Sequence, residues 1–200
     1  MNSESTTDKA EWRRRFRAGL KHLSQAQREE DSARARDLLR RQTAWQQAGA
    51  ILFYAPMAVE LDLWPMLGEA LQAGKAAALP GFVAEFGGYQ AFEVSDFTRD
   101  CAPGKFGIAE PRAHCRPMSL KRLDLVLAPG LGFDVSGRRL GRGQGFYDRL
   151  LADIAGAKCG VAFDQQVVGQ IPAARHDVSM NFILTPTRWL EVSRQISVQS

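Results

Sequence analysis

The sequence predicts a three-layer α/β/α protein with a mainly parallel central sheet. After residue 50, short apolar runs alternate with helical segments and turns, the pattern of a parallel sheet connected by crossover helices. The runs are continuously hydrophobic, as expected for strands covered on both faces. With 200 residues, 45% hydrophobic and 24% charged, the chain can bury a full core. We therefore expect a single domain over residues 1–200.

Two helices within residues 8–48 are expected to pack on this α/β core. The first covers residues 8–22, where Asp8 can cap the helix and large apolar side chains recur at every fourth position. These side chains are Trp12, Phe16 and Leu20. The second begins at Ser24, which can form a capping box with Gln27, and continues to Gly49.

The remaining elements follow from apolar runs bounded by turn residues. Strands are predicted over residues 50–56, 75–80, 91–95, 123–129, 159–163 and 181–186. Helices are predicted over residues 62–73 and 145–155. Residues 96–119 contain three prolines and two glycines with little periodicity, so this segment is expected to form a surface loop.

The net charge of +4 resides in the N-terminal quarter of the chain. Residues 1–50 hold 11 Lys and Arg against 7 Asp and Glu, whereas residues 51–200 hold 15 of each. Part of this charge forms a stripe on the first helix, made of Lys9, Arg13 and Arg17. A solvated helix face explains the stripe on charge alone, and contact with nucleic acid or an acidic small molecule is the alternative.

Cysteine usage and apolar segments bear on the compartment. The three cysteines form no CxxC pair, which predicts neither a disulfide framework nor a zinc knuckle. His114 and Cys115 with Cys101 offer too few ligands, and we interpret their proximity in sequence as incidental. The N-terminus lacks a signal-peptide core, and no apolar run is long enough to span a bilayer. We expect a cytoplasmic, monomeric protein without membrane contact.

Residues 137–149, GRRLGRGQGFYDR, combine glycine with arginine. The segment follows a predicted strand and precedes a predicted helix, so we expect it at the carboxyl edge of the sheet, where ligands bind. A phosphate site and a flexible structural loop explain the glycines equally well. Asp148 in the first helical turn can hold Mg²⁺ or simply complement the helix dipole. The spacing fits neither a Walker loop nor the dinucleotide fingerprint.

A longer stretch, LAPGLGFDVSGRRLGRGQGFYDRLL at 127–151, resembles the signature of the 5-formyltetrahydrofolate cyclo-ligase family, also called methenyltetrahydrofolate synthetase. The resemblance extends over nearly the whole chain. KAEWR at 9–13 resembles the family's Lys-x-x-x-Arg nucleotide element, and VELDLWPML at 59–67 resembles its Glu-containing substrate segment. GKAAALP, FGIAEP and VAFDQQVVGQIPAARHDVSMNFILT follow in the family's order.

The resemblance implies a fold of the sugar-phosphate isomerase and CoA-transferase type. It also implies an ATP- and Mg²⁺-dependent closure of 5-formyltetrahydrofolate to 5,10-methenyltetrahydrofolate. In the family's mechanism the formyl oxygen attacks the γ-phosphate of ATP, N10 of the folate adds to the activated carbon, and phosphate departs. Because no covalent enzyme nucleophile is required, the protein's work is positioning and charge stabilisation.

The resemblance assigns roles to individual residues. Arg142 and Tyr147 are expected to be catalytic. Glu60 and Phe106 are expected to bind the folate, and Asp148 and Asp177 to hold Mg²⁺. The residues expected to contact ATP are Lys9, Arg13, Arg139, Leu140, Gly141, Arg142, Gly143, Gln144, Gly145, Phe146 and Tyr147. From the residues alone, the simpler interpretation is that Glu60 caps a helix and that Phe106 packs in the core or in a loop.

Two other functions compete with this one. Another phosphate-ligand enzyme on the same fold would keep the glycine loop. A nucleic-acid-binding relative would use the N-terminal arginines and the GRG loop for phosphate contacts. The chain has one GRG unit rather than a repeat, and no aromatic RNA-binding motif, which favours a small-molecule enzyme.

Overall fold

The computed structural model describes residues 3–104, 107–172 and 177–192 of the chain. A mixed, mainly parallel sheet of seven strands runs through its middle, in the order β12-β11-β9-β6-β1-β2-β3. The parallel strands are β1 (Ala50–Leu52), β2 (Ala76–Val83), β6 (Leu125–Pro129), β9 (Ala157–Val161) and β11 (Phe182–Leu184). The antiparallel edge strands are β3 (Gly88–Glu93) and β12 (Trp189–Glu191). The predicted fold class is confirmed.

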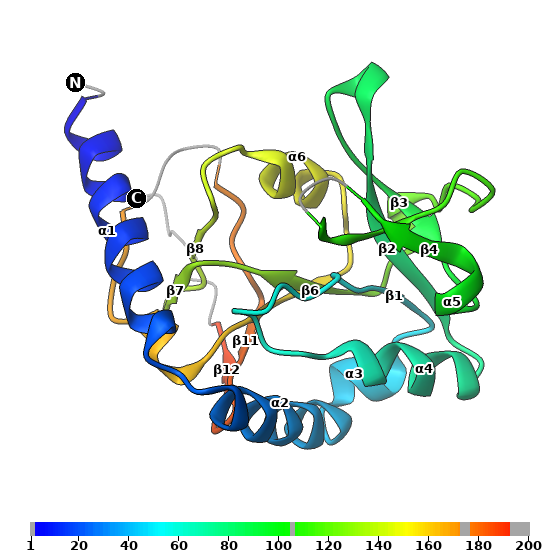
Figure 1. Ribbon diagram of the computed structural model, residues 1–200, viewed down its shortest axis with the longest axis horizontal. Coiled ribbons are helices and arrows are strands. Elements are labelled where there is room, and N and C mark those ends of the chain that lie inside the picture. The colour runs from blue at the N-terminus through cyan, green and yellow to red at the C-terminus, as the bar shows by residue number, and fades with distance from the viewer. Residues whose placement is uncertain (1–2, 105–106, 173–176, 193–200) are drawn as a thin grey trace, which may run out of the picture.

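Helices cover both faces of this sheet (Figure 1). On one face lie α2 (Gln25–Arg40), α3 (Thr43–Gln47) and α4 (Trp64–Gln72), and on the other lies α6 (Phe146–Ala152). Leu125 and Leu127 share a buried cluster with Met66 of α4, whereas Val126 shares one with Leu151 of α6. Successive residues of a strand point to opposite faces. The continuously apolar runs in the sequence therefore reflect burial on both sides.

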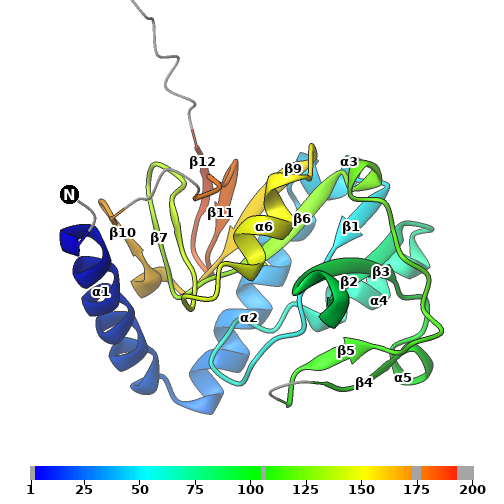
Figure 2. The same ribbon diagram turned by 90° about the horizontal axis from the view of Figure 1, so that it is seen from above.

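The first helix, α1 (Ser3–Lys21), lies at one end of the molecule against a small sheet (Figures 1 and 2). That sheet consists of β10 (Val167–Val168), β7 (Gly132–Asp134) and β8 (Arg139–Leu140). Phe16 of α1 packs with Leu131 and Leu140, and Leu20 joins the main core. The apolar stripe is confirmed, but the cap predicted at Asp8 is wrong, because the helix already begins at Ser3.

The second predicted helix is interrupted. Ser24 caps α2 by accepting the Gln27 N–H at 3.1 Å, but the Gln27 side chain donates to Asp31 and does not complete the capping box. The helix ends at Arg40, and Gln42 is extended before α3 begins. The break lets Trp45 of α3 pack edge-on against Phe53 in the core, which explains why the prediction of one helix to Gly49 is wrong.

Residues 96–119 contain secondary structure that the sequence did not predict. They include α5 (Phe97–Asp100) and an antiparallel pair of strands, β4 (Cys101–Pro103) and β5 (Ala109–Pro111). Short 3-10 helices occur at Ala84–Phe86, Leu120–Arg122 and Asp164–Gln166. The expected surface loop is therefore wrong in part. Among all described residues, the helices are too short or too polar to cross a membrane.

Close packing of Gly160 on Phe133 is testable by substitution. A Cβ atom added to Gly160 in β9 would lie 2.4 Å from Cε1 of the buried Phe133 ring. We expect Gly160→Ala to lower the free energy of unfolding by about 1–3 kcal/mol through overpacking. The matched control is Gly68→Ala in α4, where the added methyl meets open space. It should raise stability by roughly 0.5–1 kcal/mol. Urea unfolding measures the free energy of unfolding of both variants. An unchanged value for Gly160→Ala would contradict the close packing of Gly160 on Phe133.

Candidate functional site

A cavity of about 180 Å³ opens where β1 and β6 end. This is the carboxyl edge of the parallel sheet, where ligands bind in open α/β folds. The loop between β8 and α6, residues 141–145, forms one wall, and we call it the glycine-arginine loop. Side chains of the β2–β3 hairpin and of β5 form other walls. The lining residues are Ala55, Met57, Glu60, Pro80, Tyr89, Ile108, Ala109, Glu110, Pro129, Gly130, Arg139, Gly141, Arg142, Gln144, Gly145, Phe146, Tyr147 and Asp148.

Arg139 is the buried cation of the cavity, with a side chain 3% exposed. Its Nη2 donates to Asp148 Oδ1 at 2.7 Å, and its Nη1 donates to the Pro129 carbonyl at 3.2 Å. Its guanidinium also lies 5.6 Å from the centroid of the Tyr147 ring. Among the residues that the structure describes, the Arg139 Nε has no hydrogen-bond partner. The Nε donor is thus buried without a partner, whereas both Nη atoms of the guanidinium are bonded within the protein.

Glu60 and Arg142 form a second ion pair, with Oε1 and Nη2 3.0 Å apart. The other oxygen of Glu60 accepts the Met57 N–H at 3.0 Å. At the start of α4, Asp62 rather than Glu60 accepts the Trp64 N–H. The helix-cap interpretation of Glu60 is therefore wrong, because its carboxylate turns into the cavity instead.

The sequence suggested that the glycine-arginine loop follows β6 directly, but the structure shows otherwise. The β7–β8 hairpin comes between them, and buried Asp134 holds its turn by accepting the N–H groups of Ser136 and Arg138. Beyond β8, Gly143 and Gly145 have φ angles of +108° and +66°. These values lie in the region that favours glycine. The loop therefore depends on glycine for its backbone path.

Two of the three residues of the basic stripe on α1 face the protein rather than solvent. Arg13 Nε donates to the Gly141 carbonyl at 3.0 Å, which ties α1 to the glycine loop. Lys9 Nζ lies 2.6 Å from Asp177 Oδ2, and both side chains are 13% exposed. The solvated-face interpretation therefore fails for Lys9 and Arg13, whereas Arg17 is exposed.

Aromatic side chains form another part of the cavity wall. Tyr89 contacts Phe146 and Tyr147, with ring centroids 5.6 Å and 5.9 Å away. Burial raises the pKa of Tyr147, and the nearby Glu60 carboxylate raises it further. The Tyr147 phenol is therefore protonated at neutral pH and can donate a hydrogen bond.

The structure brings most of the predicted site residues together. Lys9, Arg13, Gly143 and Asp177 lie outside the lining, although Arg13 contacts the loop. Leu140 packs into the core beside α1, so any contact with ATP would come from its backbone. Phe106 lies outside the described residues. The sequence did not single out Met57, Tyr89 or Glu110, because nothing in the local pattern indicates that they meet at one cavity.

The fold and the cavity define an α/β protein in which a glycine- and arginine-rich loop and several aromatic side chains line one cavity. Residues 5–186 match the model of the 5-formyltetrahydrofolate cyclo-ligase family. The chain belongs to this family of ligases.

Individual relatives agree with the family match. A 5-formyltetrahydrofolate cyclo-ligase of Mycolicibacterium smegmatis is 41% identical over 93 residues, covering 45% of this chain and 48% of the relative. The enzyme of that name from Escherichia coli K12 is 32% identical over 133 residues, covering 64% and 73%. The NMR structure of Aquifex aeolicus 5,10-methenyltetrahydrofolate synthetase superposes with a TM-score of 0.84, 28% identity and 96% coverage of both chains.

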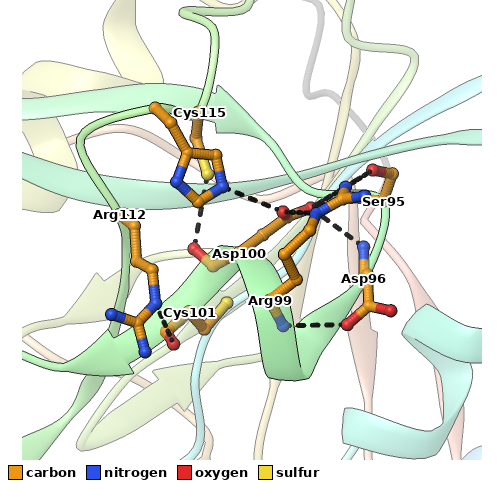
Figure 3. Close-up of polar contacts among 8 residues, drawn as sticks. Ser95, Asp96, Arg99, Asp100, Cys101, Arg112 and Cys115 are labelled. Carbon is orange, nitrogen blue, oxygen red and sulfur yellow. Dashed lines mark hydrogen bonds and ion pairs between the residues drawn. The ribbon is translucent and has the colours of Figure 1, made fainter.

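A second polar cluster lies outside the cavity lining and includes Asp100, His114 and Cys115 (Figure 3). These three side chains each have a ligand-type atom within 4.8 Å of the others. The Asp100 carboxylate, however, already accepts hydrogen bonds from Arg99 Nε at 2.6 Å and from the Ser95 N–H at 2.8 Å. His114 Nε2 lies 3.1 Å from the same carboxylate.

The chemistry of this cluster suits a structural anchor better than a metal site. Burial raises the pKa of the Cys115 thiol, which keeps it protonated, and the Arg99 guanidinium repels a cation. The Asp100 carbonyl accepts the Arg112 N–H at 2.7 Å and the Cys115 thiol at 3.3 Å. Asp100 thus connects α5 to the segment after β5.

This anchor should make stability depend on pH. The Arg99 guanidinium, with help from the Ser95 N–H and His114, holds the pKa of Asp100 well below its usual range. Its contribution is therefore complete above the unfolded-state pKa of about 3.9 and is lost as the pH falls below that value. We expect Asp100→Asn to lower the free energy of unfolding by about 2 kcal/mol at pH 7.

The difference in the free energy of unfolding between Asp100→Asn and wild type should become smaller when urea unfolding is repeated between pH 4 and pH 2. Asp37→Asn, at a largely exposed carboxylate, serves as the control and should change stability little. A gap that stays constant down to pH 2 would contradict the anchor role of the Asp100 charge.

Proposed function

We propose that the protein converts 5-formyltetrahydrofolate to 5,10-methenyltetrahydrofolate with MgATP. The observation that carries the proposal is that the glycine-arginine loop and an aromatic wall line the same cavity. A phosphate-bearing ligand and a flat ring ligand can therefore meet there. Family membership over residues 5–186 supports the same reaction.

The loop and its neighbours suit a nucleotide. Gly143 and Gly145 allow the backbone to approach phosphate oxygens without a Cβ in the way. Arg139 is a cation of the cavity wall, and Arg13 contacts the loop from α1. We assign these residues, with Lys9, to the phosphates. When bound, MgATP supplies the phosphoryl group that makes the formyl oxygen a leaving group.

Asp148 and Asp177 are the proposed Mg²⁺ ligands, and carboxylate oxygens are the donors that Mg²⁺ prefers. Each of them is paired here with a basic residue assigned to phosphate: Asp148 with Arg139 and Asp177 with Lys9. The pairs hold all four side chains in place. Binding of MgATP would exchange these internal pairs for contacts of the same charge type.

Glu60, Tyr147 and Arg142 are the groups proposed to act on the folate and on the developing charge. Glu60 is 11% exposed and can accept hydrogen bonds from N–H groups of the ring. The protonated Tyr147 phenol can donate one. Arg142, on the loop beside Glu60, is placed to stabilise negative charge that builds during phosphoryl transfer.

The nucleic-acid alternative has less support. Of the basic residues that it would use, Arg142 is paired with Glu60 and Arg13 donates to the Gly141 carbonyl. This leaves the exposed Arg14, Arg15 and Arg17. A phosphate backbone needs an accessible basic surface. Another phosphate-ligand enzyme on this fold would keep the loop but not require the aromatic wall.

A direct assay tests the proposal. Purified protein mixed with 5-formyltetrahydrofolate and MgATP should produce the absorbance of 5,10-methenyltetrahydrofolate. Omission of ATP, or chelation of Mg²⁺ with EDTA, should abolish the signal. Lack of product from well-folded protein under these conditions would refute the proposed reaction.

Substitutions in the loop separate nucleotide binding from turnover. Gly143→Val places a β-branched residue at a φ of +108°, a conformation that costs about 1–3 kcal/mol. We expect it to weaken binding of MgATP by roughly 10-fold or more. Arg142→Ala should lower kcat by roughly 100-fold, with a smaller effect on nucleotide affinity. Calorimetry with a non-hydrolysable ATP analogue and the absorbance assay measure the two effects.

Gly74→Val is the matched control for backbone strain. Gly74 also has a positive φ, of +75°, and precedes β2 at the far edge of the sheet from the cavity. It should destabilise the fold without changing nucleotide affinity. If Gly143→Val kept wild-type affinity for the ATP analogue and Arg142→Ala kept normal turnover, the role of the loop would be purely structural.

A further inference from the structure

We infer that Arg149 is a specificity-determining residue that binds the glutamate carboxylates of the folate substrate. A reduced folate carries its ring at one end and a glutamate with two carboxylates at the other. The inference rests on the proposed function and extends it to the part of the substrate that does not react. It starts from an arginine of the glycine-arginine segment that the proposed reaction leaves without a role.

Arg149 lies against the cavity wall, although it does not line the interior. A Cβ atom built on Gly145 would be 3.3 Å from Arg149 Nη1. The guanidinium carbon lies 5.0 Å from the centroid of the Phe146 ring, and Nη2 donates to the Gly87 carbonyl at 3.3 Å. Gly145 and Phe146 both line the cavity. The guanidinium therefore sits at the rim, between the glycine loop and the tip of the β2–β3 hairpin.

The charge at this rim is not neutralised by the protein. Arg139 and Arg142 are paired with Asp148 and Glu60. In the parts of the chain that the structure describes, no carboxylate lies within ion-pair distance of Arg149. Its side chain is exposed, so it can receive an anion without first breaking an internal pair.

The depth of the cavity gives the substrate a direction. The buried end holds Arg139, 3% exposed, and Glu60, 11% exposed, and the reacting groups belong there. Tyr89 and Phe146 form the aromatic wall that leads outward, and Arg149 stands at its open end. An elongated substrate with its ring at the buried end would carry its carboxylates toward Arg149.

The guanidinium lies against the Phe146 ring, and its planar shape lets it meet a carboxylate with two parallel hydrogen bonds. The contact is exposed and partly screened by solvent. We therefore expect the charge of Arg149 to be worth about 5- to 20-fold in KM for the glutamate-bearing substrate.

The test compares two substrates on the wild-type protein and four variants. The substrates are 5-formyltetrahydrofolate and 5-formyltetrahydropteroate, which has the same ring system but no glutamate. Arg149→Met keeps an unbranched side chain over Phe146 without the charge, Arg149→Gln is a second neutral variant, and Arg149→Lys restores the charge. Arg122→Met, at an exposed arginine 3.2 Å from Glu93, is the control.

The two neutral variants should raise KM for 5-formyltetrahydrofolate by about 5- to 20-fold and leave KM for the pteroate unchanged. In both variants kcat and affinity for the non-hydrolysable ATP analogue should stay at wild-type values, and Arg149→Lys should recover much of the loss. Arg122→Met should match wild type throughout.

Equal rises in KM for both substrates, or a fall in kcat alone, would overturn the inference and make Arg149 a support for the hairpin tip. In that case normal turnover by the wild-type protein would leave the proposed function standing. Absence of turnover by the wild-type protein on either substrate would overturn the proposed function and this inference together.

Discussion

The ion pair between Arg139 and Asp148 is the interaction on which the rest of the site depends. It joins β8 to the first turn of α6, so it closes the glycine loop that lies between these two residues. A guanidinium as deeply buried as that of Arg139 needs this partner, because loss of one member of a buried pair costs about 3–5 kcal/mol. The same guanidinium bonds to the Pro129 carbonyl and lies over the Tyr147 ring. One side chain thus fixes the end of β6, the loop and the aromatic wall relative to one another.

Pairing also explains how the cavity and its surroundings can hold several cations before a ligand arrives. Lys9, Arg139 and Arg142 each lie within 3.0 Å of a carboxylate oxygen, which offsets the repulsion between like charges in a partly dry environment. Arg13 is held differently, by the Gly141 carbonyl. The site therefore has the side chains of an anion-binding site but little net charge of its own.

The sequence was sufficient for the elements whose burial is local. The run Leu125–Ala128 alternates between two cores, and its unbroken hydrophobicity predicted a strand covered on both faces. The short strands β4, β5, β7, β8 and β10 could not be predicted, because runs of two or three residues carry too little pattern to identify a strand. For β10 the partner is also distant in sequence, since Val167 pairs with Phe133. The site divides in the same way. The loop, Glu60 and Asp148 follow from motifs and resemblance, whereas Tyr89 reaches the cavity through the pairing of β3 with β2, which no local pattern reveals.

Glycine and arginine occur together in the loop because each glycine faces a guanidinium. A Cβ atom on Gly141 would lie 3.2 Å from Arg139 Nη1, one on Gly145 would lie 3.3 Å from Arg149 Nη1, and one on Gly143 would lie 3.7 Å from Arg13 Cζ. The first two distances are tighter than ordinary van der Waals contact, so a side chain there would push the guanidinium away. The glycines therefore serve the arginines as well as any ligand, since they let three cations from α1, β8 and α6 approach one stretch of backbone. A larger residue at Gly141 or Gly145 would alter the position of a charge and not only the path of the chain.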